Sequence, residues 1–253
     1  MRGSAPLMRQ AGGMTADRWT QAVRHQLGIG RLLPLGDARD GAWIAERAAE
    51  AVLRGAAGDA PGVRLDALRV TLADVTDVGE PAVPAPPSAL PPGPLRVTAE
   101  IAATAARPLP ATASVLREAL ANAADRRLGL TVTEVDLQVT GLLDEEGPAE
   151  GGPAVALPEL PAAARAVGDD EARVAAAALG VPGVLHLTGT LGHPVHIELL
   201  FPEGAALPHR HVRLELAVGA DQRARDVARE VRTAVRRTLS DHPTAAVVVS
   251  AIG

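Results

Sequence analysis

Four histidines in two short segments are the residues of this sequence best suited to metal chemistry. They are His193, His196, His209 and His211, and the stretch FPEGAALP lies between the two pairs. Imidazole nitrogens bind zinc and copper, and side chains two residues apart on a strand share one face. The four are therefore candidate metal ligands. A His-x-x-His spacing without a carboxylate or cysteine partner is equally typical of a polar hairpin end, and our prediction is that no metal is bound.

Four arginines near the C-terminus form a stripe on a helix predicted over residues 221–239. They are Arg225, Arg229, Arg232 and Arg236. At about 100° per residue they share one narrow face, apart from a face of valines. Such a stripe could bind lipid phosphates, RNA or an acidic partner, for instance residues 144–146 of another copy. The alternative is a solvated face whose charge Asp226 and Glu230 relieve.

The residue combinations of common enzymes are absent from the sequence. There is no Cys and no Lys, which excludes thiol nucleophiles, Schiff-base lysines and a P-loop. No serine stands in Gly-x-Ser-x-Gly, no His-Glu-x-x-His occurs, and GIGRLL at Gly28 lacks the third glycine of a dinucleotide fingerprint. We therefore predict a protein that is not an enzyme and that needs no cofactor.

Composition limits the partners of the chain. Its formal net charge of −5 argues against nucleic-acid binding, and one Phe, two Trp and no Tyr leave little aromatic surface on which bases could stack. No stretch is apolar enough for a signal peptide or a transmembrane helix. We expect a cytoplasmic protein, or one peripheral to the inner face of the membrane, with a disordered lead-in at residues 1–14.

Hydrophobic periodicity predicts a helix-strand-strand-helix-strand order in the first half. The helices are expected over 15–27, 41–54 and 111–128, and the strands over 63–73, 95–103 and 131–140. Asp40 is a suitable N-cap for the helix at 41–54, and Gly129 a suitable stop for the helix at 111–128. The segment 79–94 holds seven prolines, so we expect an extended surface loop there.

The same order recurs after an acidic Pro/Gly-rich linker at 144–168. We expect a helix that is capped by Asp169 or Asp170 and ends at residue 179. Strands follow near 184–190, 195–201 and 211–218. Asp221 caps the last helix, and residues 244–252 form the final strand. Short phrases also match: PGVRL with PGVLHL, RVTAEIA with VRLELAV, and VLREALANAA with VAREVRTAVR. We interpret the chain as an internal duplication.

One such unit resembles the alkaline shock protein family of bacterial envelope stress response proteins. The matching text is GRLLPLGDARDGAWIAERAAEAV, PGV, LRVTAEIA and LREALANAADRRLGLTVTEVDLQVTG in the first half, with VPGV, VRLELAV and DVAREVRTAVRRTLSDHPTAAVVV in the second. The chain departs from that family in its Pro-rich loop, in the missing Gly-basic-apolar opening of the second unit, and in having two units. The resemblance implies a non-enzymatic cytoplasmic protein that associates with itself and with a small membrane anchor.

The sequence thus predicts an α+β protein of two tandem small units, each an open sheet packed with amphipathic helices. The first unit would span 15–143 and the second 169–253. We expect a non-catalytic envelope stress response protein that acts as an assembly or scaffold module, as a homo-oligomer or docked to a membrane-anchored protein partner. The alternative is a nucleic-acid-binding module that uses the arginine stripe. Against it, the chain has no Gly-x-x-Gly loop flanked by basic residues.

Overall fold

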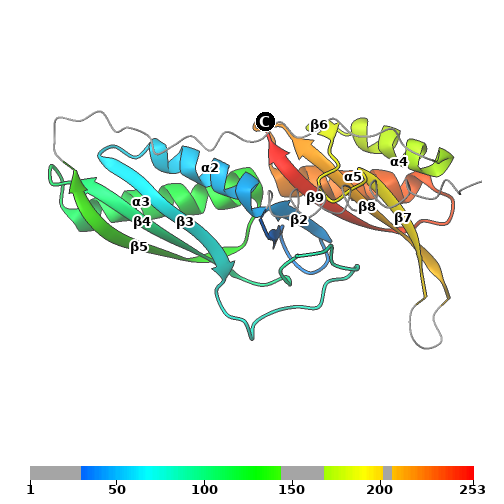
Figure 1. The fold of residues 1–253 in the computed structure, drawn as a ribbon, viewed down its shortest axis with the longest axis horizontal. Helices are drawn as coiled ribbons and strands as arrows, with labels where there is room; N and C mark the ends of the chain where they lie inside the picture. Colours follow the sequence, from blue (N-terminus) through cyan, green and yellow to red (C-terminus); the bar gives the residue numbers. More distant parts are fainter. Residues whose placement is uncertain (1–29, 144–167, 202–206) are drawn as a thin grey trace, which may run out of the picture.

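The computed structural model describes residues 30–143, 168–201 and 207–253. Over these residues the chain is an α+β protein with four α-helices and two open mixed sheets of three and six strands (Figure 1), which confirms the predicted class. The predicted lead-in, the predicted helix at 15–27 and nearly all of the predicted linker lie outside the described residues. Within the described ranges, no helix is both long and apolar enough to cross a bilayer.

The smaller sheet has its central strand between an antiparallel and a parallel neighbour. Its strands are β3 (Val63–Leu72), β4 (Leu95–Thr104) and β5 (Val132–Leu143). β4 pairs antiparallel with β3 and parallel with β5. The helices beside it are α2 (Glu46–Gly58) and α3 (Leu109–Ala123), which continues into the π-helical turn η1 (Ala124–Leu128). Apolar residues alternate along β4 with exposed polar ones, so one face of the sheet packs on the helices.

The larger sheet repeats this arrangement and adds three strands. Its members are β1 (Leu32–Pro34), β2 (Ala42–Ala45), β6 (Val184–Leu187), β7 (Val195–Leu200), β8 (His209–Val218) and β9 (Thr244–Ile252). β8 pairs antiparallel with β6 and β7 and parallel with β9. The helices of this half are α4 (Asp169–Leu179) and α5 (Ala224–Thr238). β7 and β8 extend from the body as a two-stranded arm (Figure 1).

The predicted helix at 41–54 is wrong at its N-terminal end. Residues 42–45 are strand β2, which pairs parallel with β9, and the helix begins only at Glu46. Trp43 and Ile44 are fully buried beside Val248 and Val249 of β9. Burying these two large side chains in the sheet outweighs the local helical preference of the segment. Asp40 is consequently not a helix cap.

The predicted caps of the second half are also wrong, although its helices form. α4 has Gly168 at its N-cap. Asp169 and Asp170 lie in its first turn, where their negative charges interact favourably with the positive end of the helix dipole. α5 begins at Ala224 behind Arg223, because residues 219–222 make a turn closed by a hydrogen bond from the Gln222 N–H to the Gly219 carbonyl. Asp221 lies in that turn, too far from the first helical turn to cap it.

The two Pro-Gly turns do form, and they lie at matching places in the two halves. One joins α2 to β3 and the other joins α4 to β6. Gly62 has φ 74° and Gly183 has φ 89°, a left-handed conformation that glycine adopts without steric cost. Each turn reverses the chain between a helix and the antiparallel neighbour of the central strand.

The Pro-rich segment 79–94 contains no helix or strand, as predicted, but it is more than a surface loop. The Leu32 N–H donates to the Ser88 carbonyl (3.1 Å), and the Leu90 N–H donates to the Leu32 carbonyl (2.8 Å). The Trp43 indole N–H donates to the Leu90 carbonyl (3.2 Å). The loop therefore covers β1 and the indole of β2. Buried apolar residues of both sheets form one continuous hydrophobic core.

Candidate functional site

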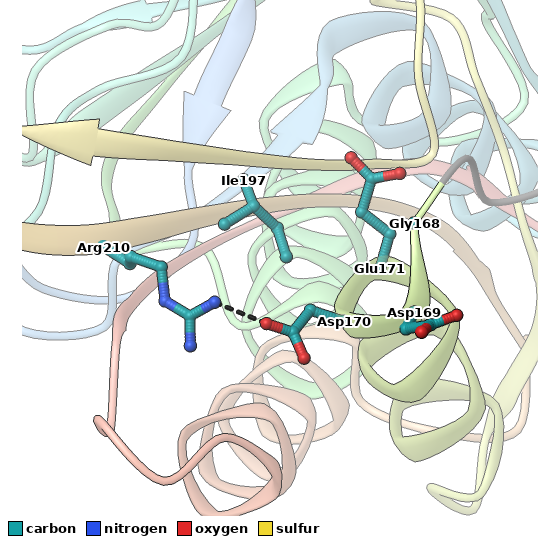
Figure 2. Close-up of a pocket in the computed structure, with 6 residues that line it drawn as sticks. All are labelled: Gly168, Asp169, Asp170, Glu171, Ile197 and Arg210. Carbon is teal, nitrogen blue, oxygen red and sulfur yellow. Dashed lines mark hydrogen bonds and ion pairs between the residues drawn. The ribbon is translucent and has the colours of Figure 1, made fainter.

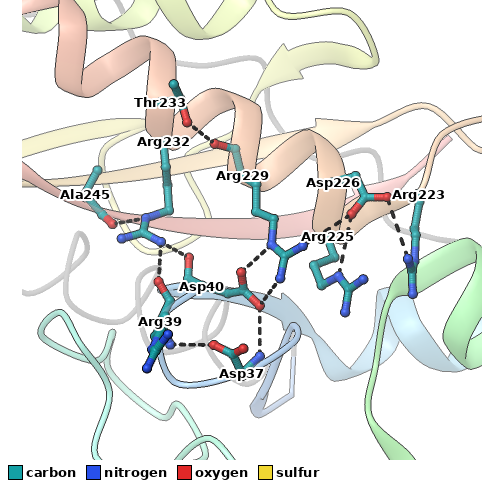
Figure 3. Close-up of polar contacts among 10 residues, drawn as sticks. All are labelled: Asp37, Arg39, Asp40, Arg223, Arg225, Asp226, Arg229, Arg232, Thr233 and Ala245. Carbon is teal, nitrogen blue, oxygen red and sulfur yellow. Dashed lines mark hydrogen bonds and ion pairs between the residues drawn. The ribbon is translucent and has the colours of Figure 1, made fainter.

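Helix α5 lies against the turn that joins β1 to β2, so the arginine stripe faces the first half of the chain. Figure 3 shows Arg229 and Arg232 pointing from the helix toward Asp40 and its neighbours. The turn is closed by a hydrogen bond from the Asp40 N–H to the Asp37 carbonyl (3.0 Å), and Asp37 in turn accepts from the Arg39 N–H (2.8 Å). Both aspartates therefore stabilise the turn.

Asp40 is the anion at the centre of this contact. Its side chain is 6% exposed and accepts two hydrogen bonds from Arg229, one of them from Nη2 to Oδ2 at 2.9 Å. Burial acts to raise the pKa of Asp40. The hydrogen bonds from Arg229 and from the Asp37 N–H outweigh burial and hold that pKa below its ordinary value. The pair is therefore a buried carboxylate held ionised by a half-exposed guanidinium.

Arg232 uses its guanidinium to hold backbone rather than a ligand. Its Nε donates to the Ala245 carbonyl of β9 (2.9 Å), and its Nη1 donates to the carbonyls of Arg39 (2.7 Å) and Asp40. Burial, followed by repulsion from Arg236, lowers the pKa of Arg232. The side chain thus bridges the last strand of the chain and the turn that leads into β2.

Two further arginines extend the contact to the end of α3. Arg223 donates from Nε to the Asp125 carbonyl (2.8 Å) and from Nη2 to the Asp125 carboxylate (2.6 Å). Arg225 lies over Gly129, where a Cβ would come within 2.5 Å of the Arg225 Cβ. Its Nε is buried without a hydrogen-bond partner and lies 3.6 Å from the carboxylate of Asp226. We call these residues, Asp40, Asp125, Arg223, Arg225, Arg229 and Arg232, the arginine clasp.

The predicted stripe is therefore divided in the structure. The arginine clasp includes Arg225, Arg229 and Arg232. Arg236 lies exposed farther along the helix, and its backbone carbonyl lies within hydrogen-bond distance of the His242 ring. Periodicity located the stripe, but its acceptors lie about 190 residues away in the chain, which periodicity could not indicate. Binding of an outside anion at the stripe remains a prediction.

The four histidines do not converge. His196 of β7 lies opposite Arg213, whereas His209 and His211 of β8 lie opposite Leu200 and Glu198. His193 is exposed in the segment between β6 and β7. In the part of the chain that the structure describes, no three His, Cys, Asp or Glu side chains are grouped so as to hold a metal ion.

His211 is instead a buried residue of the larger sheet. It is 3% exposed, and its Nδ1 lies 2.8 Å from the Thr244 hydroxyl. Burial lowers its pKa to about 4, because desolvation penalises the charged ring, with Glu198 opposing and His209, Arg213 and Arg232 reinforcing the shift. The ring is therefore neutral in the folded protein above that pH.

Glu215 is a buried carboxylate that no sequence motif indicated. It accepts hydrogen bonds from the Thr190 hydroxyl (2.7 Å) and from the Leu191 N–H (2.9 Å). Burial raises its pKa, and these two donors partly offset the rise. The carboxylate fixes the segment between β6 and β7 to the sheet. In the sequence, Glu215 alternates with apolar residues along β8. This pattern is the same as in any strand with one polar face, so it did not indicate a buried carboxylate.

An open cavity of about 550 Å³ lies between the start of α4 and the arm (Figure 2). It is lined by Gly168, Asp169, Asp170, Glu171, Ile197 and Arg210. Its one cation is already neutralised, since Arg210 contacts Asp170 (2.6 Å) and Asp241 (2.5 Å). The cavity thus offers carboxylates and one apolar side chain.

The comparisons with known proteins give no family assignment. No protein-family model matches the chain, and no curated protein sequence matches it either. The class that fold and site define is an α+β protein with two open sheets, in which an arginine clasp on α5 holds the β1–β2 turn of the larger sheet and the η1 turn beside the smaller sheet.

Proposed function

We propose that the chain is a non-catalytic assembly module of the envelope stress response type, built from two related helix-strand-strand-helix-strand units. The matching strand registers of the two halves support a duplication. Val63 of the first Pro-Gly-Val lies opposite Ala103 near the end of β4, and Val184 of the second lies opposite Val218 at the end of β8. The two halves thus share pairing as well as element order.

Two side-chain contacts support the duplication at finer detail. The Nε of Arg117 in α3 donates to the Val135 carbonyl of β5 (3.2 Å), as Arg232 in α5 does to Ala245 of β9. The hydroxyl of Thr140 in β5 donates to the Ile101 carbonyl of β4 (3.2 Å). In the other half Ser250 of β9 donates to the Leu216 carbonyl of β8 at the same distance. These positions match by strand register, which aligns Arg117 with Arg232 and Val97 with Val212. The sequence phrases are aligned differently, by three residues in the helix and one in the strand, so the structure supports the duplication in a register that the phrase match did not give.

The observation that carries the assembly role is that three of the large exposed apolar side chains lie on or beside the arm. Leu199 is 51% exposed, Phe201 is 73% exposed and Leu207 is 84% exposed. Arg229 and Arg232, in the middle of the stripe, already bind Asp40 within the same chain. Exposed apolar side chains gathered in this way favour a protein-protein contact, for which we propose a membrane-anchored partner.

Imaging the full chain as a fluorescent fusion in its native cell tests this function. We expect signal along the cell envelope and co-purification of one membrane-anchored protein. Phe201→Ser with Leu207→Ser should make the signal diffuse, because the arm loses its apolar surface. Val75→Ser is the matched control, since Val75 is 76% exposed but lies outside the arm. A diffuse signal from the unaltered chain, with no partner, would overturn the proposal.

The nucleic-acid-binding alternative has less support. Arg229 and Arg232 already contact the Asp40 turn, and the net charge of −5 opposes binding to phosphate. RNA retention by the full chain that falls with salt and is lost in Arg236→Gln would favour this alternative over the assembly role.

A further inference from the structure

The outer edges of the last strands, β5 and β9, differ between the two halves. β9 is covered on its outer edge by β2, with Ala42, Trp43 and Ile44 opposite Val247, Val248 and Val249. β5, among the described residues, pairs only with β4 and forms the free edge of the smaller sheet (Figure 1). The outer edge of β9 is thus occupied by β2, whereas the matching edge of β5 has no neighbouring strand among the described residues.

An apolar row follows each edge, and its burial reflects this difference. Ala245, Val247 and Val249 of β9 are fully buried. By register with the central strands, their counterparts on β5 are Val135, Leu137 and Val139. Val135 and Leu137 are only half-buried, and Val139 is 39% exposed. The row on β5 is therefore left partly open where β9 has a neighbouring strand.

The backbone of the open edge is also set for pairing. On β9 the Val247 N–H donates outward to the Gly41 carbonyl, so residues 245, 247 and 249 direct their polar groups to the outer edge. The counterparts 135, 137 and 139 do the same on β5. Arg117 holds the Val135 carbonyl as Arg232 holds the Ala245 carbonyl, and Ala245 lies beyond the residues of β9 that pair with β2. An added strand must therefore share the Val135 carbonyl with Arg117 or displace that side chain.

We infer that this edge pairs with β5 of a second copy, antiparallel and centred on Leu137. The inference rests on the proposed assembly function. Val135 then lies opposite Val139 of the second copy, and all three apolar residues pair with apolar residues. On the polar face Asp136 lies opposite Gln138 of the second copy and Glu134 opposite Thr140, so no like charges are directly opposed.

Neighbouring registers pair less well. Centring on Asp136 places two aspartates directly opposite each other. Centring on Gln138 places Val135 opposite Gly141 and leaves one apolar residue of each copy without an apolar partner. The sequence pattern of β5 is therefore self-complementary about Leu137.

Single cysteines test the register directly, because the chain has no cysteine of its own. At the centre of the pairing, residue 137 of one copy lies beside residue 137 of the other, within reach of a disulfide. Oxidised Leu137→Cys should run as a covalent dimer. Val139→Cys should not, since it lies opposite Val135. Equal cross-linking of both variants would contradict the register.

Charge variants test the pairing without altering the core, because Gln138 and Asp136 are exposed. Asp136 also contacts Arg96 (3.5 Å) and Gln138 lies opposite Glu100 of β4, so thermal unfolding of each variant separates loss of the dimer from loss of these contacts within one copy. Gln138→Glu opposes Asp136 of the second copy and should weaken the dimer about fivefold or more by sedimentation equilibrium. Asp136→Arg combined with Gln138→Glu should restore it. Thr71→Glu, on the same sheet face at the β3 edge, is the control and should leave the dimer intact.

The inference is overturned if the unaltered chain stays monomeric up to about 1 mM, where even weak association is populated. It is also overturned if the dimer forms but responds equally to the Gln138 and Thr71 variants. A monomer that still localises to the envelope with its partner would remove this inference alone and leave the proposed function standing.

Discussion

At the residue scale, Asp40 shows how one carboxylate can join distant parts of a chain. Its side chain is buried and accepts from Arg229, while its carbonyl accepts from Arg232. An ionised carboxylate without these donors would be costly to bury, so the turn is stable only when α5 is in place. Arg229 and Arg232 of the stripe thus have a structural use that accounts for their spacing.

His211 is the residue whose burial has a direct consequence for pH dependence. Its pKa is lowered from 6.5 to about 4 in the folded protein, whereas the unfolded chain binds a proton near the ordinary value. Between these two pH values the unfolded state holds more protons than the folded state. Stability from this group is therefore complete above pH 6.5 and falls as the pH decreases toward 4.

We predict that His211→Asn removes this component. Urea unfolding of the unaltered chain should lose about 2 kcal/mol more than the variant between pH 7 and pH 5. The asparagine amide can keep the contact with Thr244 but carries no titrating group. His193→Asn in the exposed segment is the control and retains the loss, because His211 is still present. Parallel pH profiles for the unaltered chain and His211→Asn would contradict the prediction.

At the element scale, the end of α3 is fixed by one glycine. Gly129 has φ 83° and terminates the π-helical turn, as expected of a left-handed stop, and its carbonyl accepts from the Gly36 N–H (3.1 Å). Because Arg225 lies directly over it, a side chain at this position would separate α3 from α5. The same residue thus ends a helix and permits a close contact between helices.

Gly129→Ala should therefore destabilise the protein by about 2 kcal/mol or more, from left-handed strain and the clash with Arg225. The matched control is Gly55→Ala in α2, where an added Cβ meets nothing within 4 Å. That change should stabilise the helix by about 0.5–1 kcal/mol. Thermal unfolding of both variants checks the pair, and equal shifts in Tm would contradict it.

Local elements could be predicted from the sequence wherever periodicity and packing agree. The alternating residues of β4, the valine face of α5 and the glycine stop at Gly129 all form as expected. The segment around Trp43 could not be predicted, because its strand depends on β9 at the other end of the chain. Likewise the arginine stripe was visible, but its acceptor Asp40 carries only the local signal of a turn residue.

At the scale of the whole molecule, the two halves are joined by more than the chain between them. β2 pairs with β9, Asp40 with Arg229 and Asp125 with Arg223, and the apolar core runs through both sheets. The second half alone would expose the buried edge of β9. The chain should therefore unfold as one cooperative unit rather than as two domains.

Cutting the chain tests this directly. We introduce a protease site between residues 150 and 155, cleave it, and expect the two pieces to co-elute in size-exclusion chromatography and to unfold in a single transition. Asp40→Ala with Arg223→Ala should lower the Tm of the cut protein and release a fraction of separate pieces, because both ion pairs between the pieces are then lost. The uncut double variant controls for global destabilisation. Cut but otherwise unaltered pieces that separate on dilution would contradict the prediction.

The pairing of β2 with β9 also has a consequence during synthesis on the ribosome. Ile44 meets its partner Val249 only after about 200 further residues have been made, which takes on the order of 10–40 s at ordinary translation rates. Through that interval the nascent chain carries Trp43 and Ile44 without their final neighbours. The sheet is thus closed only when β9 has emerged, and newly made chains should depend on chaperones until then.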